Sequence, residues 1–157
     1  MFLDKQCQFS DSQALTATAV GTNTYDLGTD RSIGTGEAMV VVFNVEVAAD
    51  QTTGDEDYTF TVEYSSTADQ SAGYVTMGQR VYQSGTPAAP AQDADLLVAG
   101  YKLAIAIPPT VLGDSDQYIG VRYTLAGTTP TITVSAHLMP ASMMDSTVDY
   151  ADGFAIT

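Results

Sequence analysis

Few residues in this chain have side chains suited to catalysis, and they lie far apart. His137 is the single histidine, so a Ser-His-Asp triad or a histidine metal site would have to be built on this one residue. In the alternating stretch 131–139, His137 shares a face with Thr133 and Ser135. A histidine on a polar or interface face of a strand is the simpler interpretation, and a small hydrolase built around His137 is the weakest of three functional hypotheses.

The single cysteine, Cys7, cannot form a disulfide within the chain. A reactive thiol needs a helix terminus or a cationic cluster, and only Lys5 lies nearby in the sequence. We therefore interpret Cys7 as a small residue near a docking arm.

Two acidic loops, 54–57 and 114–116, gather oxygen ligands of the kind that calcium prefers. Neither has the glycine and glutamate spacing of a regular calcium loop, so solvated turn charge is the simpler interpretation. The same carboxylates could be paired for glycoside hydrolysis, but the chain has no Trp to stack on a sugar ring. We expect no catalytic residue, no metal and no cofactor.

Composition limits the partners. The chain has 157 residues, with 5 Lys+Arg against 19 Asp+Glu and a net charge of -14. So few cations argue against binding to nucleic acid or to an acidic membrane surface. The apolar runs are far shorter than the roughly 20 residues that span a bilayer, which predicts a soluble protein. Acidic and amide residues interrupt the opening 1–16, so we do not interpret it as a targeting signal.

Alternation with a period of two residues dominates the chain and indicates β-strands. Expected strands are rich in Val, Ile, Thr, Tyr and Phe and cover 15–20, 38–49, 58–64, 74–83, 101–107, 118–125 and 131–139. Glycine, proline and aspartate turns separate them, and only 93–98 suits one helical turn, capped by an aspartate. This pattern predicts an all-β fold, an antiparallel jelly roll or β-sandwich.

The alternation also assigns faces. In 59–64 the Thr and Glu side chains fall on an expected solvent face, opposite the aromatic residues and Val62. Lys102 and Arg122 are expected to point outward from their strands and to discourage pairing between sheet edges.

We expect one domain over 1–157, with an N-terminal arm at 1–14 and a C-terminal tail at 140–157, because no linker divides the chain. Three groups of residues are candidate contacts with a partner or a second copy. They are apolar anchors separated by polar residues in the arm, methionines around Pro140, and aromatic residues in the tail. These candidates are Phe2, Leu3, Phe9, Met139, Met143, Met144, Tyr150 and Phe154. For the methionines, core filling is an equally good interpretation.

Several motifs occur in the order found in a family of phage proteins. They are Phe9-Ser10-Asp11-Ser12-Gln13-Ala14, the Thr/Ala/Val run 15–20 and Asn23-Thr24-Tyr25-Asp26-Leu27-Gly28. Later motifs are Ala99-Gly100-Tyr101 ending in Pro108-Pro109, Tyr118 to Thr124, and Tyr150-Ala151-Asp152-Gly153-Phe154. In this order the chain resembles the capsid cement, or decoration, proteins of tailed bacteriophages. The stretches 50–73 and 84–95 depart from the family pattern.

The resemblance implies a structural virion protein with a jelly-roll fold. Such a protein would assemble as a homodimer or homotrimer, bind the outer surface of the completed capsid and stabilise contacts between major capsid protein subunits. It would lie in the host cytoplasm before assembly. An alternative is a virion adhesion module that binds carbohydrate or a host receptor, and it would be sparse on a fibre or tail rather than abundant on the shell.

Overall fold

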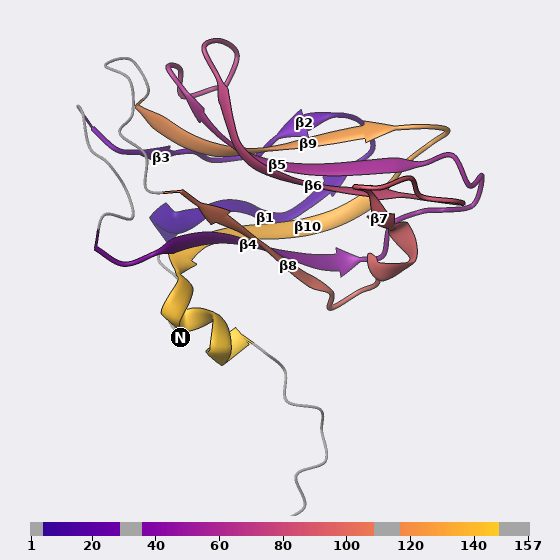
Figure 1. Ribbon diagram of the computed structural model, residues 1–157. Coiled ribbons are helices and arrows are strands. Elements are labelled where there is room, and N and C mark those ends of the chain that lie inside the picture. The colour runs from indigo at the N-terminus through magenta and orange to yellow at the C-terminus, as the bar shows by residue number, and fades with distance from the viewer. Residues whose placement is uncertain (1–4, 29–35, 109–116, 148–157) are drawn as a thin grey trace, which may run out of the picture.

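The computed structural model describes residues 5–28, 36–108 and 117–147, with side chains up to 144 in the last range. Two β-sheets pack face to face, and the short helices lie outside the two layers (Figure 1). Four predicted contact residues, Phe2, Leu3, Tyr150 and Phe154, and the acidic loop 114–116 lie outside the described residues.

The four-stranded sheet has the order β1-β10-β4-β8. Its strands are β1 (Gln8–Leu15), β10 (Ile132–Pro140), β4 (Met39–Val47) and β8 (Lys102–Ile107). The six-stranded sheet has the order β2-β9-β5-β6-β7, and β3 also pairs with β9. Its strands are β2 (Ala19–Val20), β9 (Tyr118–Ala126), β5 (Asp57–Ser65), β6 (Val75–Gln83), β7 (Gln92–Asp93) and β3 (Tyr25–Asp26).

The strand order makes the sandwich a jelly roll. All described pairings are antiparallel except the short β6–β7 contact, and the chain repeatedly crosses from one sheet to the other. Strands β1, β10, β4 and β8 face strands β2/β3, β9, β5 and β6, which is the arrangement of two interlocked Greek keys. The predicted all-β fold is therefore confirmed.

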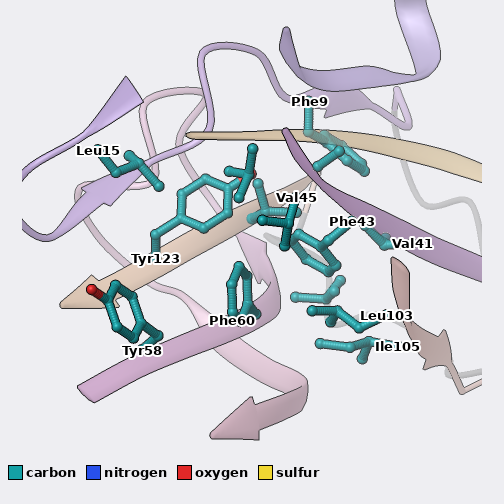
Figure 2. Packing of buried hydrophobic residues seen from close by; sticks show 14 of the residues in the cluster. Phe9, Leu15, Val41, Phe43, Val45, Tyr58, Phe60, Leu103, Ile105 and Tyr123 are labelled. Carbon is teal, nitrogen blue, oxygen red and sulfur yellow. The ribbon is translucent and has the colours of Figure 1, made fainter. Parts of the chain in front are cut away.

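Aromatic side chains form the centre of the core between the sheets (Figure 2). Phe43 and Phe60 meet edge to face with ring centroids 5.4 Å apart, and Tyr123 lies 5.9 Å from Phe60. The Tyr123 hydroxyl and Ser10 Oγ are 2.8 Å apart, so the buried phenol has a hydrogen-bond partner. Burial raises the pKa of Tyr123, which stays neutral.

Three short 3₁₀ helices complete the described structure: η1 (Lys5–Cys7), η2 (Ala94–Leu96) and η3 (Ala141–Thr147). Asp93 caps η2 by accepting a hydrogen bond from the Asp95 N–H, which confirms the predicted aspartate-capped turn. Among the described residues, no helix is long and apolar enough to cross a membrane.

The N-terminal arm predicted at 1–14 is wrong over its second half. Residues Gln8–Leu15 form β1, which pairs with β10 at the margin of the four-stranded sheet. Phe9 has no exposed surface and belongs to the core, so it cannot serve as a partner contact in the folded domain. Two bulges and a positive φ at Ser12 break the alternation of β1, which is why its pattern resembled an arm.

Candidate functional site

The outer face of the four-stranded sheet carries a second, smaller apolar cluster. Val40, Val42 and Met139 are buried there, on the side of the sheet away from the core. Ala104 of β8 and two residues of η3, Ala141 and Met144, pack against them. Of the predicted methionine contacts, Met139 is thus covered by the chain itself, Met144 is partly buried against the cluster, and Met143 is 46% exposed.

Ser135, His137 and Glu46 come together on this sheet but do not form a triad. The Ser135 hydroxyl donates a hydrogen bond to Glu46 Oε1 and accepts one from the Ser12 N–H at 3.0 Å. His137 Nδ1 is buried and has no hydrogen-bond partner in the described part of the chain. The hydroxyl is therefore directed to the carboxylate and not to the imidazole, which is the wrong order for activating a nucleophile.

The acidic loop 54–57 binds backbone N–H groups. The Glu56 carboxylate accepts hydrogen bonds from the N–H groups of Thr53, Gly54 and Asp55 at 2.9–3.1 Å, and one from the Thr53 hydroxyl. These donors lower the pKa of Glu56 to about 2, the Thr53 hydroxyl contributing most. Both Asp55 carboxylate oxygens accept hydrogen bonds from Thr128, at 3.0 and 2.9 Å.

Such carboxylates stabilise a turn and offer few free oxygens to a cation. No group of three or more possible metal ligands occurs within the described ranges. The loop also approaches its neighbours closely: a Cβ at Gly127 would lie 2.3 Å from the Asp55 carbonyl oxygen, so a side chain there would force the turns apart.

A buried ion pair lies on the outer face of the six-stranded sheet. Glu63 is 1% exposed and accepts hydrogen bonds from Arg122 Nη2 at 2.7 Å, from Arg122 Nε at 3.1 Å, and from Gln70 Nε2 at 3.0 Å. Arg122 Nη2 also donates to the Gln70 backbone carbonyl at 2.8 Å. The hydrogen bonds to Glu63 raise the pKa of the Arg122 guanidinium, which stays charged.

This network fastens the segment 66–73, which we call the strap, across strands β5 and β9. Gln70 is 1% exposed and adopts a positive φ of 54°. Its amide occupies the space above Gly120, where a Cβ would lie 2.3 Å from Gln70 Cδ. The strap is held at a second point by the Thr24 hydroxyl, which donates to the Ala68 carbonyl at 3.1 Å.

The network overturns two sequence expectations. The predicted solvent face of β5 is covered, because Glu63 and Thr61 are both buried. Arg122 lies on β9, which has paired strands on both sides, so it cannot protect a sheet edge. The sequence shows opposite charges, Glu63 and Arg122, in two predicted strands with alternating patterns. It does not show that these strands are neighbours, and only the pairing of β5 with β9 brings the two side chains together.

An open groove runs along residues 20–26, between η1 and the strap. Polar groups line it, and several are already used within the chain. Asp26 Oδ1 accepts hydrogen bonds from the Gly28 N–H at 2.7 Å and from Gln117 Nε2 at 2.9 Å, while Asn23 Nδ2 donates to the Gln8 carbonyl at 3.2 Å. Part of the polar lining of the groove is therefore already hydrogen-bonded within the chain.

Comparison with known protein families gives a match to the family described as Bbp16, over residues 9–138. The match begins in β1 and ends in β10, so it includes strands of both sheets and the whole core between them. Among curated proteins, no sequence matches this chain.

Proposed function

We propose, because the chain belongs to the Bbp16 family, that it is a structural protein of a phage-type virion and acts as a capsid cement protein. It binds the outer surface of the assembled capsid and stabilises contacts between major capsid protein subunits. The observation that carries this proposal is the family match over residues 9–138, under a name that hints at a phage-type protein.

The ordered motifs support the same proposal, and they belong mostly to the framework of the fold. Phe9 and Tyr123 lie in the core, Leu27 is buried, and Gly28 and Gly100 adopt positive φ values. These residues determine the framework of the jelly roll, whereas other positions form its surface. A rigid domain of this kind suits a protein that has to match an ordered lattice.

The physical requirement for such a protein is modest. A shell filled with DNA is under internal pressure, and a protein that binds the assembled lattice but not free subunits stabilises it by mass action. Many symmetry-related copies multiply a small contact energy. No chemical step is needed, in keeping with the structural use of Ser135, Glu46 and Glu56 within the chain.

Particles made with and without the gene for this chain test the proposal. We expect particles that lack the protein to release their DNA at a lower temperature, and added purified protein to restore the wild-type temperature. A density map should place it on the outer shell in copy numbers comparable to those of the capsomers. A few copies on a tail or fibre, with unchanged shell stability, would support the adhesion alternative instead.

A further inference from the structure

Strand β1, at the margin of the four-stranded sheet, bulges where Asp11 and Ser12 lie opposite the single residue Ser135 of β10. The Ser12 N–H donates to Ser135 Oγ at 3.0 Å, and that hydroxyl donates to the Glu46 carboxylate of β4. Ser12 adopts a positive φ of 46°, a conformation that is unfavourable for a residue with a side chain. The Ser135 hydroxyl therefore holds the bulge in a conformation that the backbone alone does not favour.

His137 lies two residues further along β10, on the same face of the sheet as Ser135. The ring nitrogen Nδ1 is enclosed and has no hydrogen-bond partner among the described residues. A neutral imidazole tolerates this position, because one of its nitrogens carries no proton, whereas imidazolium has a proton on both nitrogens. Protonation would create a charged donor at an enclosed position without an acceptor, so the described arrangement suits the neutral ring.

The charged groups around the ring come from both neighbouring strands. Burial lowers the pKa of His137, while the carboxylates of Asp11 on β1 and Glu46 on β4 oppose this effect, Asp11 more strongly. The helix η1 also contacts β10 and carries the exposed Lys5 and the partly buried Cys7, and the described side chains of η3 have no charge. Because Glu46 already accepts the serine hydrogen bond, Asp11 is the carboxylate best placed to pair with a protonated ring.

Asp11 is joined directly to the hydrogen bond that holds the bulge. The Ser12 N–H belongs to the planar peptide group that links Asp11 to Ser12, so a movement of Asp11 toward the ring also moves this donor. We propose that His137, Asp11 and Ser135 form a proton-dependent switch in the β1 bulge. With neutral His137 the Ser12 N–H is bonded to Ser135, and the imidazolium draws Asp11 inward and breaks that bond. The switch acts on the margin of the sheet at β1 and does not depend on the proposed function.

Amide hydrogen exchange and imidazole NMR, followed together from about pH 7.5 to about pH 4.5, test the switch. We expect the protection factor of the Ser12 amide to fall by roughly tenfold or more, with the same midpoint as the His137 titration. The Val45 amide, which donates to the Tyr101 carbonyl at 2.9 Å in the same sheet, is the internal control and should stay protected. Unchanged protection of Ser12 through the titration, a ring that stays neutral over this range, or an equal loss at Val45 would overturn the proposal.

Two variants separate the switch from other effects of acid. His137→Gln keeps a polar side chain that cannot be protonated, so protection of the Ser12 amide should no longer change over this range. Asp11→Asn removes the attracting charge, so the titration of His137 should move to lower pH and the Ser12 amide should stay protected when the ring is protonated. Asp95→Asn, at another exposed acidic position, is the matched control and should behave as the wild type does. A Ser12 amide that still loses protection with acid in either His137→Gln or Asp11→Asn would show that the switch is wrong.

Discussion

His137 gives the simplest test at the scale of single residues. Burial lowers its pKa below the ordinary 6.5, while the carboxylates of Asp11 and Glu46 act in the opposite direction. We expect the imidazole protons, followed by NMR, to titrate below pH 6.5. The chain has one histidine, so the assignment is immediate. A midpoint above 6.5 would show that the two carboxylates outweigh burial.

The lowered pKa of His137 should also make the free energy of unfolding depend on pH. The unfolded chain binds a proton near pH 6.5, whereas folded His137 resists it until a lower pH. The contribution of this residue to stability is therefore complete above pH 6.5 and is lost as the pH falls toward the folded-state pKa.

Glu56 predicts a second loss of stability at lower pH. Its folded pKa of about 2 lies below the ordinary 4.5, so its stabilising effect is present above pH 4.5 and disappears as the pH falls toward 2. Glu56→Gln should lower the melting temperature at pH 6 and flatten its dependence on pH between 4.5 and 2. The exposed Asp95→Asn is the control for loss of one acidic charge and should leave the melting temperature at pH 6 unchanged. An equally steep curve for Glu56→Gln would contradict the assignment.

The sequence predicted where these carboxylates gather but not what they bind. Residues 54–57 were expected to be solvated charge, with a bound cation as the alternative, and the structure gives a third result: N–H donors from the same turn. The backbone conformation of the turn determines which groups bind the carboxylates, and residue types alone do not predict that conformation. That His137 Nδ1 has no hydrogen-bond partner among the described residues could not be predicted from the sequence either, because it depends on which strands lie next to β10.

At the scale of elements, β1 is expected to be part of the folding unit. Phe9→Ala removes a fully buried ring and should destabilise the domain by about 3–5 kcal/mol, measured by urea unfolding. An arm residue would give a change close to zero. Val98→Ala, at a 54% exposed position, is the comparison and should have little effect.

The strap makes its own prediction through Gly120. A methyl group there would meet the Gln70 amide, so Gly120→Ala should cost about 1–3 kcal/mol through overpacking. Gln70→Gly removes the obstructing amide and tolerates the positive φ, so Gly120→Ala should cost less in that background. Urea unfolding of the four proteins measures the coupling, and strictly additive losses would show that the two residues do not share this space.

Alternation located strands such as β5 because apolar residues repeat with a period of two on the face that packs in the core, even where the opposite face is also covered. The expected ranges 58–64 and 118–125 agree with β5 and β9 to within a residue. Alternation did not predict the strands correctly at 15–20, where the chain leaves β1 and bends before the two-residue β2. It also did not predict the short β3. Strands of two residues are too short for a period to be read, and their existence depends on the long strand β9 that they join.

At the scale of the whole molecule, the proposed function predicts that net charge governs how fast the protein associates with a shell. With 19 acidic residues against 5 Lys+Arg, long-range steering toward positive patches is screened over about 8 Å at physiological salt. We expect association with shells to slow as salt rises while dissociation barely changes, because apolar contact holds the bound state. A dissociation rate that climbs steeply with salt would contradict this.

The position of β10 has a consequence for biosynthesis. The last strand of the jelly roll inserts between β1 and β4, whose residues precede it by more than eighty positions. A ribosome must therefore deliver residues 132–140 before the four-stranded sheet can close, and until then β1 and β4 lack their common neighbour. Contacts this distant in sequence make folding slow and late. The nascent chain therefore cannot complete the four-stranded sheet until β10 has emerged from the ribosome.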